Sequence, residues 1–232
     1  MSGISIALVV VAAPVALAGL ALTARARLAR GSPGEMTPVG DSTTTDPSTG
    51  AVRSVQAADL VVARERLAEI WTPMHLERLA RSYWRFLAKA TLGVVHVHYA
   101  PRERAVVLLA PPLKLLTFRA PEYELDGGRG LVRWRIERGL LVARSGRGNG
   151  YLQIELHRRP TERPGAACVH IEVEVANFYP AIATRLSRRL YDATQSRVHV
   201  ILTRAFVRSL ARLDLAPSKV GRFAGHARPR AL

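Results

Sequence analysis

The distribution of apolar and polar residues changes along the chain, and the first segment is the most apolar. Residues 1–24 carry no charged side chain, and Ile4 to Leu22 are almost all Ala, Val, Leu and Ile. At a rise of about 1.5 Å per residue, about 20 apolar residues span the hydrocarbon core of a bilayer. The pattern predicts a transmembrane anchor over residues 1–24.

The charges beside this segment predict its orientation. Arg25, Arg27 and Arg30 follow it, and no Lys or Arg precedes it. Basic residues favour the cytoplasmic side, so we expect a single-pass protein of the cell membrane whose carboxy-terminal domain is cytoplasmic. The alternative is a signal peptide cleaved after Ala16-Leu17-Ala18, followed by export. The missing basic residues before the apolar run favour the retained anchor.

The next stretch is poor in large apolar residues. Residues 31–58 are rich in Gly, Pro, Ser, Thr and Asp, which leaves little apolar surface to offset the entropy of ordering. We therefore expect residues 25–58 to be a basic flank and a disordered linker. Residues 59–215 are predicted to form the folded domain, and residues 216–232 a basic flexible tail.

Helical spacing of apolar residues then occurs twice in succession. Asp59 is a plausible N-cap for a helix over residues 59–70. Residues 74–91 repeat apolar side chains every three or four positions, and Gly93 follows. This second segment is predicted to be an amphipathic helix with one buried face.

After Gly93 the apolar period shortens to two for about eighty residues, which is typical of strands. Turn residues such as Asp126-Gly127-Gly128 and Arg163-Pro164-Gly165 separate the runs. We expect antiparallel strands with one apolar face and one polar face. The apolar members of the clearest runs are Val95, Val97, Tyr99, Trp134, Ile136, Leu152, Ile154, Leu156, Ile171, Val173 and Val175.

The last element is predicted to be one long helix. From Pro180, a favourable first helical residue, to Leu213 there is no further Gly or Pro. Its apolar stripe drifts around the axis, so we expect the helix to bend. Together the segments predict an α+β fold.

The order of a helical pair, a meandering sheet and a long terminal helix resembles the START-like or polyketide cyclase (SRPBCC) superfamily. The resemblance covers residues 52–215. The alternating runs carry it, together with the Gly-rich stretch from Gly146 to Gly150 and Asn177-Phe178-Tyr179-Pro180. It implies a helix-grip fold, in which a curved antiparallel sheet wraps around the long C-terminal helix. The superfamily usually begins with a strand, which only Val52 to Gln56 could supply.

The resemblance also implies a cavity between sheet and C-terminal helix that binds an apolar small molecule or lipid. The residues we expect to line it are Tyr99, Tyr123, Trp134, Ile136, Ile154 and Val173 from the sheet, and Val198, His199 and Leu202 from the helix. In the alternative, the same side chains simply fill a packed core. Pockets of this kind and solid cores have the same apolar composition, so the sequence leaves both open.

Candidate catalytic and metal-binding residues are few. His96 and His98 would lie on one face of a strand, but their spacing matches no known metal signature. His199 is a candidate general base if it faces a cavity, although a structural role is the commoner one. The single cysteine, Cys168, excludes a disulfide framework and a Cys-based zinc ribbon. We expect neither a metal nor a cofactor.

Composition narrows the possible partners. The 232-residue chain has a net charge of +16 and 48% hydrophobic residues, which excludes wholesale disorder. Basic residues without a nucleic-acid-binding motif or stacking aromatics do not indicate nucleic acid, whereas a tethered domain lies close to an anionic leaflet. We expect a noncatalytic membrane-anchored domain that binds an apolar ligand. The alternatives are a protein-interaction or scaffold module and a cyclase- or hydrolase-type enzyme.

Overall fold

The computed structural model describes residues 34–99, 103–108, 113–179, 197–213 and 215–217, with only the backbone for 197–202. The predicted anchor over residues 1–24 lies outside these ranges. Within them, no helix has both the length and the apolar character needed to cross a bilayer.

The described chain has two strands, then two helices, then seven strands and a last helix, which agrees with the predicted α+β class. The strands are β1 (Gly34–Thr45), β2 (Val52–Ala63), β3 (Val95–Tyr99), β4 (Glu103–Leu108), β5 (Lys114–Arg119), β6 (Glu122–Leu125), β7 (Arg129–Arg138), β8 (Gly150–Arg159) and β9 (Ala166–Phe178). The helices are α2 (Arg64–Ile70), α3 (Pro73–Ala90) and α5 (Arg197–Leu210), with a short 3-10 turn, η1 (Arg144–Gly146), before β8.

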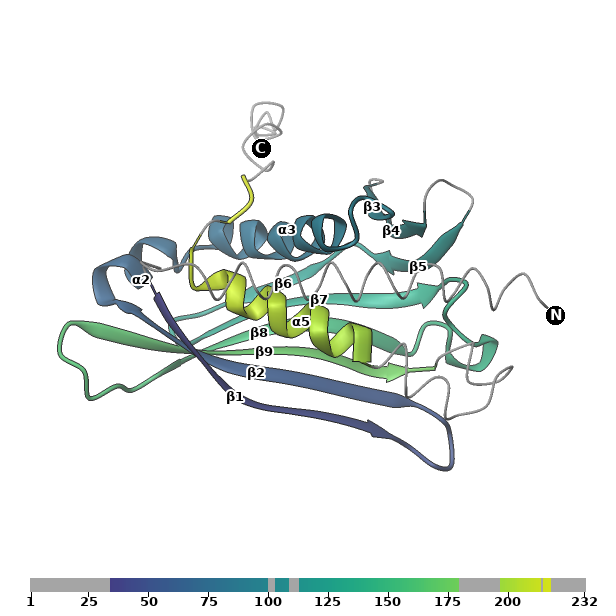
Figure 1. Cartoon of the computed structure of the whole chain (residues 1–232), viewed down its shortest axis with the longest axis horizontal. Coiled ribbons are helices and arrows are strands. Elements are labelled where there is room, and N and C mark those ends of the chain that lie inside the picture. Colours follow the sequence, from purple (N-terminus) through teal and green to yellow (C-terminus); the bar gives the residue numbers. More distant parts are fainter. Residues whose placement is uncertain (1–33, 100–102, 109–112, 180–196, 214, 218–232) are drawn as a thin grey trace, which may run out of the picture.

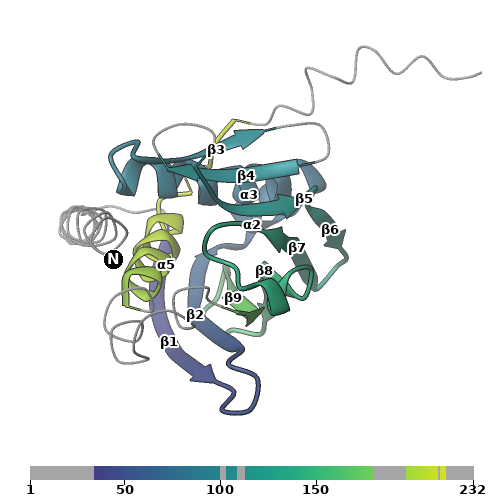
Figure 2. The same ribbon diagram turned by 90° about the vertical axis from the view of Figure 1, so that its right-hand side faces the viewer.

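All nine strands form one antiparallel sheet in the order β1-β2-β9-β8-β7-β5-β4-β3, and β6 pairs with β7 beside this path. The sheet is strongly curved. Figure 2 shows β3 and β4 at one end of the curl and β1 at the other, with α5 on the open side next to β1. The predicted antiparallel sheet is thus confirmed.

Two helices share the concave side of this sheet (Figure 1). Helix α3 begins at Pro73, after Thr72 accepts a hydrogen bond from the backbone N–H of His75, and it places Leu79, Tyr83 and Trp84 among its buried residues. Helix α5 packs against β2 and α3. The sheet therefore encloses α3 as well as the C-terminal helix. Residues 180–196 lie outside the described ranges, so the single long bent helix stays a prediction.

The first hairpin corrects the expected domain boundary. Residues assigned to the linker form β1 and most of β2, and the helix expected at Asp59 begins only at Arg64. Strand β2 pairs with β1 on one side and β9 on the other, so the sheet satisfies its backbone groups. Asp59 is no N-cap: its Oδ1 lies 2.6 Å from Nδ1 of His170 on β9.

An Asx-type turn closes this hairpin. Oδ1 of Asp46 accepts hydrogen bonds from the backbone N–H of Ser48 at 2.8 Å and of Thr49 at 3.2 Å, and Gly50 adopts a φ of +73°. The Ser48 side-chain hydrogen bond, followed by the backbone ones, lowers the pKa of Asp46 to about 2. The Asp-, Ser- and Gly-rich composition that favours a linker thus encodes a tight turn.

Charged side chains on neighbouring strands form cross-strand ion pairs on the predicted polar face. Arg129 on β7 donates to Glu155 at 2.6 Å and to Glu124 at 3.0 Å, and Arg135 donates to Glu122 at 2.7 Å. Such exposed pairs contribute about 0.2–1 kcal/mol each. The polar alternation along these strands is a solvated face rather than a catalytic constellation.

Candidate functional site

Four of the predicted ligand-binding residues lie deep in the concave face of the sheet. Trp134, Ile136, Ile154 and Val173 are at most 2% exposed. Trp134 packs edge-on against Trp84 of α3, with ring centroids 5.2 Å apart, and Tyr83 packs edge-on against Phe206 of α5 at 5.1 Å. Large aromatic side chains thus occupy the space that the sequence-based hypothesis assigns to a ligand.

The two predicted tyrosines lie apart from this aromatic cluster. Tyr99 on β3 and Tyr123 on β6 are each 44% exposed. The guanidinium groups of Arg81 and Arg104 lie 5.7 Å and 5.1 Å from the centroid of the Tyr99 ring. Partial burial is the main cause that raises the pKa of both tyrosines, that of Tyr123 to about 12. These residues line the edge of α3 rather than the centre of the concave face.

Helix α5 contains the three predicted helix residues, Val198, His199 and Leu202. The structure describes only their backbone atoms. Nothing in the structure tests whether any of the nine residues binds a ligand, so that role stays a prediction.

Metal-binding chemistry has no candidate within the described ranges, where no three His, Cys, Asp or Glu side chains gather to hold an ion. His96 and His98 lie on β3 as predicted. Cys168 is half-buried on β9, and this burial raises the pKa of its thiol, so it lacks the lowered pKa of a reactive cysteine.

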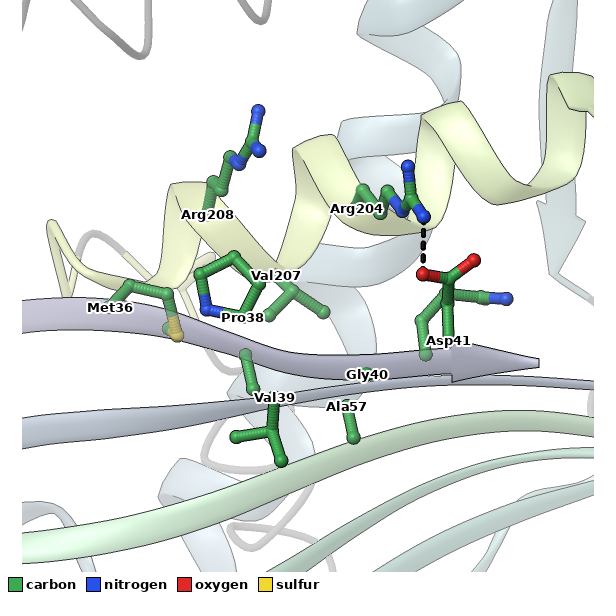
Figure 3. A pocket seen from close by; sticks show the side chains of 11 residues that line it. Met36, Pro38, Val39, Gly40, Asp41, Ala57, Arg204, Val207 and Arg208 are labelled. Atoms are coloured by element: carbon green, nitrogen blue, oxygen red, sulfur yellow. Dashed lines mark ion pairs between the residues drawn. The ribbon is translucent and has the colours of Figure 1, made fainter.

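A pocket opens where α5 meets the β1–β2 hairpin (Figure 3). Its volume is about 350 Å³. The residues that line it are Met36, Pro38, Val39, Gly40, Asp41, Gln56, Ala57, Ala58, Arg204, Val207 and Arg208. The register of the hairpin shifts between Pro38 and Gly40, so β1 bulges at this point.

The pocket has an apolar part and a polar part. Ala58 and Val207 are 2% and 4% exposed. Pro38 lies between β1 and α5 in Figure 3. Gln56 is 2% exposed; its Nε2 donates to Oγ of Ser54 at 3.0 Å, and no described atom donates to its buried Oε1. This oxygen is therefore buried as well as unpaired.

Charged groups lie at the edge of the pocket. Arg204 of α5 forms an ion pair with Asp41 of β1, drawn as the dashed line in Figure 3. Arg208 lies one turn further along α5 and points away from β1 (Figure 3). Both members of the ion pair are about half exposed, so it contributes little stability.

Sequence reasoning missed this pocket because it placed eight of the eleven lining residues in a linker. A signal was present: Val52, Ser54, Gln56, Ala58, Leu60 and Val62 occupy alternate positions, and all are at most 5% exposed in β2. Because Ser54, Gln56 and Ala58 are small or polar, the series does not show the alternation of large apolar residues that predicts a strand.

Comparison with known proteins gives similarities at the level of solved structures. No family model matches the sequence, and no curated protein matches it. An uncharacterised protein from Bacillus thuringiensis aligns at 13% identity and a TM-score of 0.34, covering 70% of this chain and 99% of that one.

Two further solved structures carry names. Norcoclaurine synthase from Thalictrum flavum, in complex with dopamine and hydroxybenzaldehyde, aligns at 12% identity and a TM-score of 0.28, covering 73% of this chain and 94% of that one. Human STARD10 aligns at 8% identity and a TM-score of 0.25, covering 81% of this chain and 77% of that one. The chain is similar to each of these two proteins over the shares given.

Proposed function

We propose that this domain binds an apolar small molecule or lipid in the pocket between α5 and the β1–β2 hairpin, without catalysing a reaction. The observation that carries the proposal is the pocket itself. Its volume of about 350 Å³ falls in the range of about 300–1,000 Å³ that is typical of small-molecule sites. It also lies between the sheet and the C-terminal helix, where the sequence predicts ligand binding.

The lining supports an apolar ligand. Met36, Pro38, Ala58 and Val207 supply carbon surface, and each Å² of apolar ligand surface removed from water contributes about 25 cal/mol. The ion pair between Arg204 and Asp41 neutralises most of the charge at the edge of the pocket. The carbon surface would hold the apolar part of a ligand, and the polar groups of the lining would orient it.

The same lining favours binding over catalysis. Among the described residues, the pocket has one carboxylate, that of Asp41, which Arg204 engages. No described histidine or cysteine lines the pocket. A general acid or base must reach the reacting group and be free to exchange a proton. The scaffold and enzyme alternatives have no comparable observation in their favour.

We also propose that the apolar segment over residues 1–24 tethers this domain to the cell membrane. The arginines after that segment support a cytoplasmic location for the domain. A lipid or another apolar compound in the bilayer would then be the nearest supply of ligand. A reporter fused after Leu232 that functions on only one side of the membrane tests the orientation.

A pocket-filling variant tests the proposed function. Ala58→Met extends a flexible side chain from β2 beside the pocket, whereas Ala80→Met makes the same change at an equally buried position on α3. The full chain, held in amphipol, is titrated with 1-decanol by calorimetry. We expect decanol to bind wild type and Ala80→Met alike, and Ala58→Met at least tenfold more weakly. No binding to wild type, or equal binding to all three proteins, would contradict the proposal.

A further inference from the structure

Three exposed leucines lie at one end of the sheet, on three separate loops, and we call this surface the leucine end. Leu92, Leu113 and Leu140 are 77%, 42% and 59% exposed, and they are three of the seven large apolar residues that are exposed in the described part of the chain. Leu92 follows α3, Leu113 precedes β5 and Leu140 follows β7. In Figure 1, α3 and β7 both end on the right-hand side of the molecule.

Backbone hydrogen bonds join the three loops. The N–H of Leu140 donates to the carbonyl of Lys114 at 3.0 Å, and the N–H of Leu108 donates to the carbonyl of Leu113 at 3.0 Å. Leu108 pairs with Val95, the first residue of β3, and the loop after α3 leads directly into β3. The loops that carry the leucines are therefore neighbours in space.

Leu92 has an unusual backbone conformation. Its φ of +53° lies in the left-handed region, directly after the C-cap of α3, a position where helices that end in this way usually have Gly. A residue with a Cβ is strained there relative to glycine. The side chain is also 77% exposed, so burial does not offset the strain. A contact outside the domain would explain why a leucine occupies this position.

The charged side chains beside these leucines are mainly basic. Lys89 lies in the last turn of α3, and Arg144 and Arg147 lie on the loop after β7. All three are exposed, and none of them forms an ion pair with another described residue. The acidic residues of β4 and β7, Glu103 and Glu137, are both paired with basic side chains. The leucine end therefore carries an excess of positive charge.

We propose that the leucine end docks on the surface of an anionic bilayer. The leucines enter the headgroup region, and Lys89, Arg144 and Arg147 lie close to the lipid phosphates. Protein segments that lie in the membrane interface combine apolar side chains with Lys and Arg in this way. The centre of a protein–protein interface is instead rich in Tyr, Trp and Arg, and leucine is uncommon among its hot spots. The docking is independent of the pocket beside α5.

This contact would also orient the domain. Strand β1 begins at the left-hand end of the sheet in Figure 1, opposite the leucine end. Residues 25–33 join the proposed anchor to β1, and nine residues reach at most about 30 Å. With the anchor near one end of the sheet and the leucines at the other, the domain lies lengthwise along the bilayer.

Fluorescence quenching within the bilayer tests the docking. An NBD label is attached at Leu92→Cys, Leu140→Cys or Met74→Cys, each combined with Cys168→Ser. The full chain is then reconstituted in phosphatidylcholine vesicles that contain one quarter phosphatidylglycerol. Met74 is the matched control, because it is apolar, 54% exposed and at the other end of α3. Doxyl groups on the acyl chains quench only labels that have entered the bilayer. We expect the labels at positions 92 and 140 to lose about half of their fluorescence, and the label at position 74 to lose almost none.

Charge reversal tests the basic residues with the label at position 92. Arg144→Glu with Arg147→Glu leaves the leucines in place and should weaken docking at least about fivefold for each residue, because each Lys or Arg near an anionic surface contributes about that factor. The quenching should therefore be lost. Arg64→Glu with Arg66→Glu makes the same charge change at exposed positions on α2, and should leave the quenching unchanged.

The outcomes separate this inference from the other proposals. Equal quenching at positions 74, 92 and 140, no quenching at 92 and 140, or quenching that needs no phosphatidylglycerol would each overturn the docking. Quenching that survives the reversal of Arg144 and Arg147 would overturn it as well. If the chain does not float with the vesicles at all, both the docking and the proposed anchor are wrong. The pocket is tested separately, by the decanol titration.

Discussion

The concave side of the sheet is packed in two different ways. Beneath α3, Tyr83, Trp84 and Trp134 interlock, and Trp134 is 1% exposed. Beneath α5, β2 presents Gln56 and Ala58, and a pocket of about 350 Å³ remains. The region beneath α3 is filled by large aromatic side chains, whereas the lining of the pocket is smaller and partly polar. The pocket therefore lies beside small residues on β2, and the sheet itself can be curved without being hollow.

The largest expected effect lies in the filled region. Trp134→Ala removes a ring that contacts Tyr83 and Trp84, and truncation of a buried aromatic costs about 3–5 kcal/mol of unfolding free energy. Trp71→Ala, where the indole Nε1 donates to the carbonyl of Asp126 at a less buried position, should cost clearly less. Denaturant unfolding measures both. Equal losses would mean that the ring cluster is not the main core.

A smaller effect in the same region depends on pH. Burial is the main cause that raises the pKa of Tyr83 to about 12, and the neighbouring Thr203 hydroxyl lowers it in part. In the unfolded chain a tyrosine loses its proton near pH 10, so deprotonation favours unfolding above that pH. The stabilising effect of the neutral Tyr83 is complete below pH 10 and is lost as the pH rises through 12.

This pH dependence has a direct check. The unfolding free energy of wild type should fall by about 2 kcal/mol more between pH 10 and 12 than that of Tyr83→Phe, because most of the effect of a shift of two pKa units falls in this range. Denaturant titrations at pH 9, 10, 11 and 12 measure the difference. Parallel curves for the two proteins would place Tyr83 in contact with water and weaken the description of a filled region.

Much of the filled region could be predicted from the sequence, and the pocket could not. Alternation identifies β7, β8 and β9, and helical spacing identifies α3, because large apolar residues mark the buried positions there. Strand β2 buries two polar residues, Ser54 and Gln56, so apolar residues do not mark all of its buried positions. Its sequence therefore resembles that of a linker. Pairing with β9, which lies more than a hundred residues away, stabilises it. The sequence of β2 alone does not indicate this pairing with a distant strand.

For the predicted ligand-binding residues too, the sequence predicts burial but not a cavity. Trp134, Ile136, Ile154 and Val173 are buried, yet they belong to a packed core in which Trp134 contacts Tyr83 and Trp84. An apolar side chain indicates that a position is buried, but it does not indicate whether there is an empty volume beside it. Asp41 and Arg204 are 163 positions apart and meet only through the curl of the sheet and the placement of α5. Their pairing could not be derived from either local sequence.

The smallest expected effect is the cost of added volume. Ala80→Met enlarges a side chain in the filled region, where overpacking costs about 1–3 kcal/mol. Ala58→Met enlarges one of the same exposure beside the pocket, and should cost less than about 1 kcal/mol because the new atoms have space. Unfolding in denaturant compares the two. A larger cost for Ala58→Met would indicate that the two regions are packed alike.

Photolabelling tests most directly whether the ligand occupies the pocket rather than the aromatic core. A long-chain alcohol with a diazirine in its hydrocarbon part is irradiated with the full chain, and the labelled peptides are sequenced by mass spectrometry. Our account predicts labels within residues 36–41, 56–58 and 204–208, and their loss when unlabelled decanol is in excess. Labels concentrated on residues 131–136 and 152–156, or labels that excess decanol does not displace, would contradict it.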